Sequence, residues 1–240
     1  MLYYCLGGII MSRIVRCLLI SILLTTILSL IQRIKQDFLK KLSFILYEEK
    51  NPDHYLEELN SFSGKLFMSN RDRLILSIDA LMLKKEYQEV SDIFELLEKL
   101  KLSELHQLAL YQKKIAYYLE IKNNIKAIES FNQLKQLSQN NRQRAIQLVV
   151  EENDILIHVY AKKDGYYAQS LENKAKTIRD HHAKGICLYR SAVSYYNLKD
   201  FDKCKSLLEE AAFYLKDTIY EKTIQQVLNG DLDLMYEKIM

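Results

Sequence analysis

Pairs of amphipathic stretches recur along most of the chain, and this recurrence limits the possible fold more than any other feature. In residues 188–216, two stretches with apolar residues at helical spacing are separated by the polar break Lys199-Asp200. Similar pairs lie in residues 74–100, 108–137 and 144–178, and a weaker pair in 37–62. The 240 residues include only six Gly and one Pro, too few for the turns of a β-rich fold. The sequence therefore predicts an all-α protein.

The pairs recur at a nearly constant interval. The residues that open the second helix of successive pairs are roughly 34 to 43 positions apart, namely Tyr87, Asn124, Tyr167 and Phe201. An interval of this size between helix pairs is typical of α-solenoids, in which each hairpin packs on its neighbours. We therefore expect a solenoid of about five helical hairpins over residues 36–240, ending in a shorter pair at 218–228 and 232–239.

The N-terminal segment differs from the rest of the chain. Residues 17–31 contain no charged side chain, and Arg16 and Arg33 flank them. A helix of this length measures about 22 Å, shorter than a bilayer core, but flanking arginines that reach the headgroups extend the usable stretch to residues 14–34. We expect residues 1–35 to form a transmembrane anchor in the lipid bilayer. A cleaved signal peptide and a buried helix are the alternatives, and translation starting at Met11 instead of Met1 stays open.

The charges near this segment indicate its orientation. Arg33, Lys35, Lys40 and Lys41 follow it, whereas only Arg13 and Arg16 precede it. Because positive charges favour the cytoplasmic side, we expect a single-pass protein of the cell membrane with a cytoplasmic repeat domain.

Composition and motifs argue against several functions. The formal net charge is +3 and there is no basic stripe, so we expect no nucleic-acid partner. The four cysteines form no CxxC pair, and the adjacent His181 and His182 cannot face one ion together on a helix. No phosphate-binding loop or hydrolase motif occurs. We expect no catalytic residue, no cofactor and no metal, and an enzyme is the least favoured reading.

The pair in residues 188–216 resembles the tetratricopeptide repeat. The positions that this repeat fills with large, small and aromatic residues hold Leu188, Ala192, Tyr195, Phe201, Cys204, Leu208 and Ala211. A second pair is similar to it through Tyr111, Ile115, Tyr118, Ala127, Phe131 and Leu134, although Ile115 replaces a small residue. The resemblance implies a right-handed α-solenoid that binds proteins or peptides. It is weaker before residue 70, and the terminal proline of the repeat is missing.

In such repeats the first helix of each hairpin lines a groove. The corresponding residues here are Ile75, Met82, Gln112, Leu119, Tyr189, Val193, Tyr196 and Asn197. They are mostly apolar or aromatic, which favours an apolar helix or an extended peptide as ligand. The alternative is that Tyr189, Val193 and Tyr196 are covered by neighbouring repeats or by the C-terminal helices.

The expected function is that of a membrane-anchored interaction module, a scaffold or adaptor that recruits a protein or peptide partner. Two other readings share the same architecture: a peptide-sensing receptor, and an envelope assembly factor that faces away from the cytoplasm.

Overall fold

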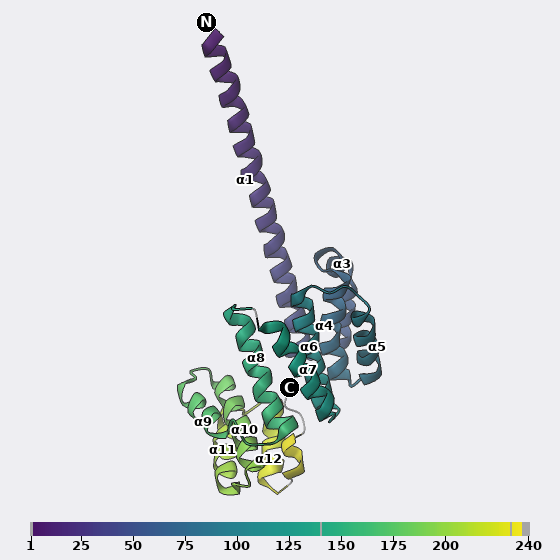
Figure 1. Cartoon of the computed structure of the whole chain (residues 1–240), viewed down its shortest axis with the longest axis vertical. Helices are drawn as coiled ribbons and strands as arrows, with labels where there is room; N and C mark the ends of the chain where they lie inside the picture. Colours follow the sequence, from purple (N-terminus) through teal and green to yellow (C-terminus); the bar gives the residue numbers. More distant parts are fainter. Residues whose placement is uncertain (1, 140, 231, 237–240) are drawn as a thin grey trace. The chain divides into compact units, whose positions relative to one another are not determined.

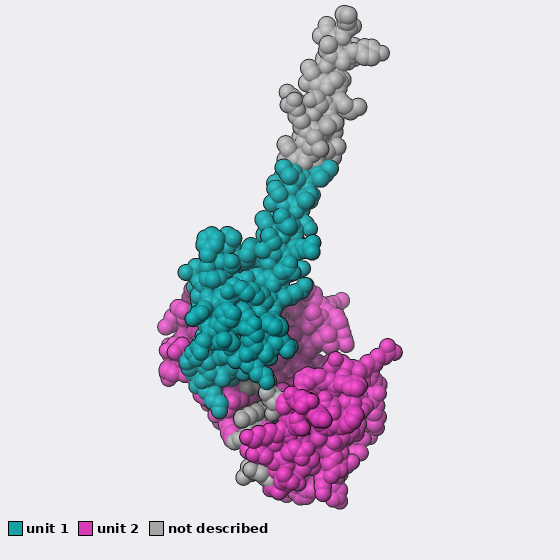
Figure 2. Space-filling model, turned by 180° about the vertical axis from the view of Figure 1, so that it is seen from behind, with its two compact units in different colours: residues 1–86 teal, residues 87–240 magenta. Residues whose placement is uncertain are grey.

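The computed structural model describes the backbone of residues 2–139, 141–230 and 232–236, and the side chains of residues 21–139, 141–218, 220–230 and 234–236. All regular structure within these residues is helical, which confirms the all-α class, and the paired helices are compatible with a solenoid (Figure 1). The chain divides into unit 1, residues 1–86, and unit 2, residues 87–240 (Figure 2). The boundary expected at residue 35 lies inside unit 1, within one continuous helix.

Unit 1 begins with a long helix and continues with short ones. Its elements are α1 (Leu2–Ser43), the π-helical turn η1 (Phe44–Glu48), α2 (Pro52–Asn60), α3 (Phe62–Phe67) and α4 (Asn70–Lys84). The end of α1 packs on the others through a core of Phe38, Leu42, Ile45, Leu46, Tyr55, Leu59, Met68 and Ala80. The Tyr55 hydroxyl donates to the Leu76 carbonyl over 3.3 Å, which joins α2 to α4.

Before residue 35, the part of α1 whose side chains are described exposes a broad apolar surface beside a narrower polar strip of Ser21, Thr25, Ser29 and Gln32. Its large side chains are 43–61% exposed, namely Ile22, Leu23, Leu24, Ile27, Leu28, Leu30, Ile31 and Ile34. Among the described residues, no helix has both the length and the apolar character needed to span a bilayer. Residues 14–20 of the expected membrane segment lie outside the described side chains.

Unit 2 holds the remaining helices. These are α5 (Tyr87–Glu98), α6 (Glu104–Glu120), α7 (Asn124–Ser138), α8 (Arg144–Leu156), the π-helical η2 (Ile157–Lys162), α9 (Ala168–Thr177), α10 (His181–Asn197), α11 (Phe201–Tyr214), α12 (Ile219–Leu228) and the 3₁₀-helix η3 (Leu232–Tyr236). The expected pairs at 108–137 and 188–216 are the hairpins α6–α7 and α10–α11. The last expected helix is the short η3, and residues 237–239 lie outside the described residues.

One turn geometry recurs before several helices. A lysine with φ between 52° and 63° lies two residues before α2, α5, α7 and α11, at Lys50, Lys85, Lys122 and Lys199. In three of these turns the next N–H donates to a carbonyl five residues earlier: Glu86 to Leu81, Asn123 to Tyr118 and Asp200 to Tyr195, over 2.8–3.0 Å. This bond is one of the two that define the Schellman turn at helix ends. The shared geometry agrees with the regular spacing of the second helices.

Small side chains let the helices of the α10–α11 hairpin approach closely. Ala192 and Ala211 are fully buried, and Cys204 is 3% exposed, in one core with Leu188 and Leu208. Burial raises the pKa of Cys187, and it raises the pKa of Cys204 to about 11. Both thiols therefore stay protonated near neutral pH and serve as packing groups.

A partly buried carboxylate joins α9, α10 and α11. Glu172 accepts hydrogen bonds from Lys203 Nζ at 2.9 Å and from the Tyr195 hydroxyl at 3.1 Å, and its side chain is 16% exposed. The hydrogen bond from Lys203, followed by that from Tyr195, lowers the pKa of Glu172 despite its burial. A carboxylate with a lowered pKa stabilises the fold above its unfolded pKa and loses this contribution as the pH falls through the folded value.

We expect Glu172→Gln to lower the free energy of unfolding by roughly 1 kcal/mol at pH 7, because charge-assisted hydrogen bonds are lost. The difference from wild type should shrink as the pH falls from about 4.3, the ordinary pKa of glutamate, through the lower pKa of the folded state, because below that pKa the wild-type carboxyl group is neutral too. Urea unfolding followed by circular dichroism at pH 7 and pH 3 measures both values. An equal difference at the two pH values would contradict the assigned role.

Candidate functional site

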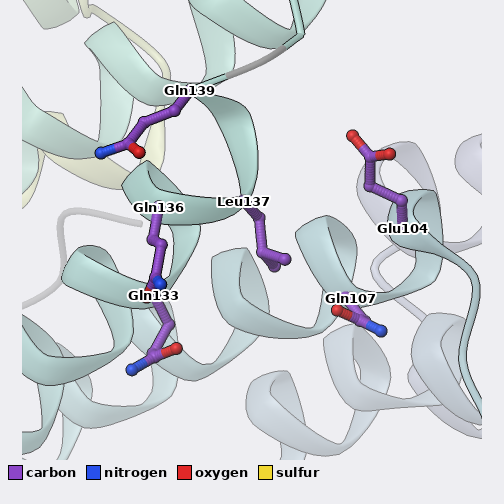
Figure 3. Close-up of a pocket in the computed structure, with 6 residues that line it drawn as sticks. All are labelled: Glu104, Gln107, Gln133, Gln136, Leu137 and Gln139. Carbon is purple, nitrogen blue, oxygen red and sulfur yellow. The ribbon is translucent and has the colours of Figure 1, made fainter.

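Two neighbouring depressions lie along α6 and α7. One depression of about 540 Å³ is lined by Glu104 and Gln107 of α6 and by Gln133, Gln136 and Leu137 of α7 (Figure 3). A second of about 470 Å³ is lined by Glu98, Tyr111, Lys114, Tyr118, Lys126, Glu129, Ser130 and Gln133. Because Gln133 borders both, they form one surface, which we call the α6–α7 groove.

Helical spacing explains why these side chains share a face. The α6 side of the groove consists of residues three and four apart, namely Glu104, Gln107, Tyr111, Lys114 and Tyr118. Such residues lie above one another on a helix. On α7, Lys126, Glu129, Gln133 and Gln136 follow the same rule. The buried residues Ile115, Ala127, Phe131 and Leu134 lie beside these side chains and fix the hairpin, and Tyr111 and Tyr118 pack against the same core.

The charges at one end of the groove are already compensated. Lys114 is 8% exposed, and its Nζ pairs with Glu98 of α5 and lies 5.5 Å from the Phe94 ring centroid. Lys126 Nζ lies 5.5 Å from the ring centroid of Tyr118. Burial raises the pKa of Tyr118, so its hydroxyl stays protonated near neutral pH and can donate a hydrogen bond. The groove therefore offers aromatic surface and paired charges rather than an excess of one sign.

The other end of the groove offers amides. Gln107 Nε2 donates to the Leu102 carbonyl over 3.2 Å, and Glu104 accepts from Asn141 Nδ2 over 3.2 Å. The side chains of Gln133 and Gln136 are exposed to solvent, and their amides make no hydrogen bond to another side chain or carbonyl within the described part of the chain. Each of these amides presents both a donor and an acceptor, the same pair of groups that a peptide main chain presents.

The residues predicted from the repeat pattern lie in different environments. Ile75 is buried and Met82 half-buried on α4, in unit 1. On α6, Gln112 is exposed and Leu119 is half-buried against the hairpin core. On α10, Tyr189 and Val193 are 1% and 0% exposed, while Tyr196 and Asn197 are half-buried. Tyr189 and Val193 are thus core residues in this conformation and present no surface to a partner.

The C-terminal turn η3 covers this part of α10. The Tyr189 hydroxyl donates to the Met235 carbonyl over 3.3 Å, and Asn197 Oδ1 accepts from the Tyr236 hydroxyl. The rings of Tyr196 and Tyr236 are 6.0 Å apart. The surface expected to hold a ligand on α10 is therefore occupied by the chain itself, which is the alternative that the sequence left open.

The described histidines and cysteines form no metal-ligating cluster. No group of three or more His, Cys, Asp or Glu side chains in the described residues is placed to hold an ion. His181 packs against Tyr214 with ring centroids 5.4 Å apart, and His182 against Tyr220 at 6.3 Å. The two adjacent histidines thus have separate aromatic neighbours.

Comparison of the chain with protein family models, curated proteins and solved structures finds no match in any of the three.

Proposed function

We propose that the chain is a membrane-anchored interaction module of tetratricopeptide-like architecture that binds an extended peptide segment of a partner protein in the α6–α7 groove. The observation that carries the proposal is the combination in one groove of two solvent-exposed glutamine amides with the rings of Tyr111 and Tyr118. Amides can form hydrogen bonds with the main chain of a peptide, and tyrosine rings can pack against its side chains.

The length of the groove sets the size of the ligand. From Glu104 to Tyr118 the α6 side rises about 21 Å at 1.5 Å per residue. An extended chain advances about 3.3 Å per residue, so about six peptide residues fit along it. Because Lys114 and Lys126 already face acidic or aromatic groups, we expect selection by hydrogen bonds and shape more than by net charge.

The anchor is supported by the chemistry of α1. A helix that exposes a broad surface of leucine and isoleucine side chains suits a lipid environment better than water. Its threonines also satisfy their own hydroxyls: Thr25 bonds to the Ser21 and Ile22 carbonyls and Thr26 to the Ile22 carbonyl, over 2.7–3.0 Å. Such bonds remove the cost of placing a hydroxyl in hydrocarbon. Confinement to a membrane raises the effective concentration of partners there, so a modest groove affinity suffices.

The solenoid architecture is supported by the recurring lysine turns and by the small buried residues of the α10–α11 hairpin. Units 1 and 2 are assigned to the cytoplasmic side of the membrane because more Lys and Arg residues follow the anchor than precede it.

The Gln133→Ala/Gln136→Ala variant tests the groove. Ten-residue peptides are selected from a random library on the full chain in detergent micelles, and their affinity is measured by fluorescence anisotropy. We expect the double variant to bind the selected peptides about 10- to 100-fold more weakly, because two hydrogen bonds of about 1 kcal/mol each are lost.

The matched control is Gln169→Ala, which removes an exposed glutamine of α9 outside the groove. It should bind as the wild type does. Equal affinity of the double variant and the control would place the peptide elsewhere on the chain.

A further inference from the structure

The short helix α3 has an exposed apolar face that the groove and the core do not use. Phe62 is 82% exposed and Leu66 is 64% exposed. They are four residues apart, so they lie on one side of the helix, and the exposed Lys65 lies beside them. An exposed phenylalanine and leucine next to each other indicate contact with something apolar.

The helix α3 packs closely on its neighbours in unit 1. The Phe67 ring packs on Phe38 of α1 with centroids 6.0 Å apart. Gly64 is buried, and a Cβ atom placed on it would lie 2.0 Å from the Leu59 carbonyl oxygen of α2. Because that oxygen belongs to a helix backbone and cannot move aside, only glycine permits this approach. These contacts place α3 beside the end of α1 and against α2.

The position of α3 along α1 indicates what covers the exposed face. Ile34 is the last exposed residue of the apolar stretch of α1, and Phe38, which binds α3, lies about 6 Å further along the helix. The polar headgroup layer on each side of a bilayer is about 5–8 Å thick. Figure 1 shows α3 at the end of the compact part of unit 1 from which α1 extends. An anchored α1 therefore brings α3 to the depth of the headgroups.

We propose that α3 inserts Phe62 and Leu66 into the headgroup–acyl boundary of the membrane that α1 enters. The exposed lysines Lys35 and Lys65 suit the same layer, where a cationic side chain reaches the phosphates while its stem stays apolar. The inference rests on the proposed anchor and adds to it a second contact, which fixes unit 1 against the bilayer surface.

The test uses the absence of tryptophan from the chain. Phe62→Trp introduces a single tryptophan into the full chain, and Phe213→Trp does the same at a phenylalanine of α11 that is 74% exposed. Both variants are reconstituted into phosphatidylcholine liposomes with and without lipids that carry a quencher near the headgroup. Because both phenylalanines are exposed, the exchange requires no repacking of the core.

We expect emission from Phe62→Trp at shorter wavelength than from Phe213→Trp, with at least about twofold stronger quenching by the labelled lipids. Equal emission and equal quenching of the two variants would overturn the inference. A blue-shifted emission that the labelled lipids do not quench, and whose blue shift is lost when the protein is diluted in lipid, would also overturn the inference. It would indicate that Phe62 contacts a second copy of the chain.

Flotation of the same liposomes separates this inference from the anchor. If the chain floats and Phe62→Trp is not quenched, the anchor stands and the α3 contact is rejected. If the chain stays at the bottom of the gradient, the anchor is rejected and the α3 contact with it.

Discussion

The Leu24→Arg/Leu28→Arg variant is expected to lose its attachment to membranes. The two leucines are 54% and 59% exposed and lie four residues apart, on one face of α1. An arginine near the centre of a membrane helix costs about 2.5–3.5 kcal/mol on insertion scales, so two cost roughly 5–7 kcal/mol. At 1.4 kcal/mol for each factor of ten, this lowers the inserted fraction by about four orders of magnitude.

Flotation of liposomes after cell-free synthesis measures this loss. Leu24→Ala/Leu28→Ala is the matched control, because it shortens the same side chains without adding charge, and it should float with the lipid. Since neither leucine is buried, the helical circular dichroism of both variants should match that of the wild type. Flotation of the arginine variant together with the control would mean that α1 does not enter the bilayer.

Ala192→Leu is expected to have the largest effect on stability. Ala192 is fully buried on α10, in the core that holds Cys204 and Ala211. Three added carbon atoms have no space there, so the helices of the α10–α11 hairpin must separate or distort. Overpacking of a well-packed core costs about 1–3 kcal/mol. We therefore expect unit 2 to unfold at markedly lower temperature or urea concentration.

Ala183→Leu provides the comparison on the same helix, since Ala183 is exposed near the start of α10. Its effect should stay within about 0.5 kcal/mol, as for most surface substitutions. Urea unfolding of the full chain in detergent gives both values. If the two variants were equally stable, Ala192 would not occupy a close helix–helix contact.

Helix starts could be predicted from the sequence where a local residue determines them. The Asn51-Pro52 pair marks the start of α2, because the Asn51 side chain accepts from the His54 N–H and proline suits the first helical position. Asn123 similarly caps α7 through the Lys126 N–H. Ala192 and Cys204, which hold small-residue positions of the repeat pattern, are both buried in the α10–α11 hairpin.

The continuity of the first helix was not predicted. The sequence suggested an anchor ending near residue 35 and a separate helix from Asp37, but α1 runs through both to Ser43. The change from apolar to charged side chains marks a change of environment, and nothing in that region interrupts the helix. The lysine turns were missed for a different reason, because left-handed backbone is usually assigned to Gly or Asn.

The candidate site depends on tertiary packing that the sequence pattern does not predict. The repeat pattern left open whether Tyr189 and Val193 line a groove or are covered by other helices. The folded chain shows that Met235 and Tyr236, some forty residues away, lie against that part of α10. The α6–α7 groove had a signal in the sequence: polar and aromatic residues three and four apart from Glu104 to Tyr118. That signal alone does not distinguish a groove from an ordinary solvated helix face, because the depression depends on how α7 packs beside α6.

Photo-cross-linking of a selected peptide to the anchored chain tests the central claim most directly. A benzophenone form of the tightest peptide is added to the full chain in liposomes, irradiated, and the attachment sites are identified by mass spectrometry. We predict attachment within residues 98–137, on the α6 and α7 sides of the groove, and its loss in the Gln133→Ala/Gln136→Ala variant. Attachment confined to α10–α12 or to unit 1, unchanged in that variant, would contradict the assignment of the α6–α7 groove as the partner site.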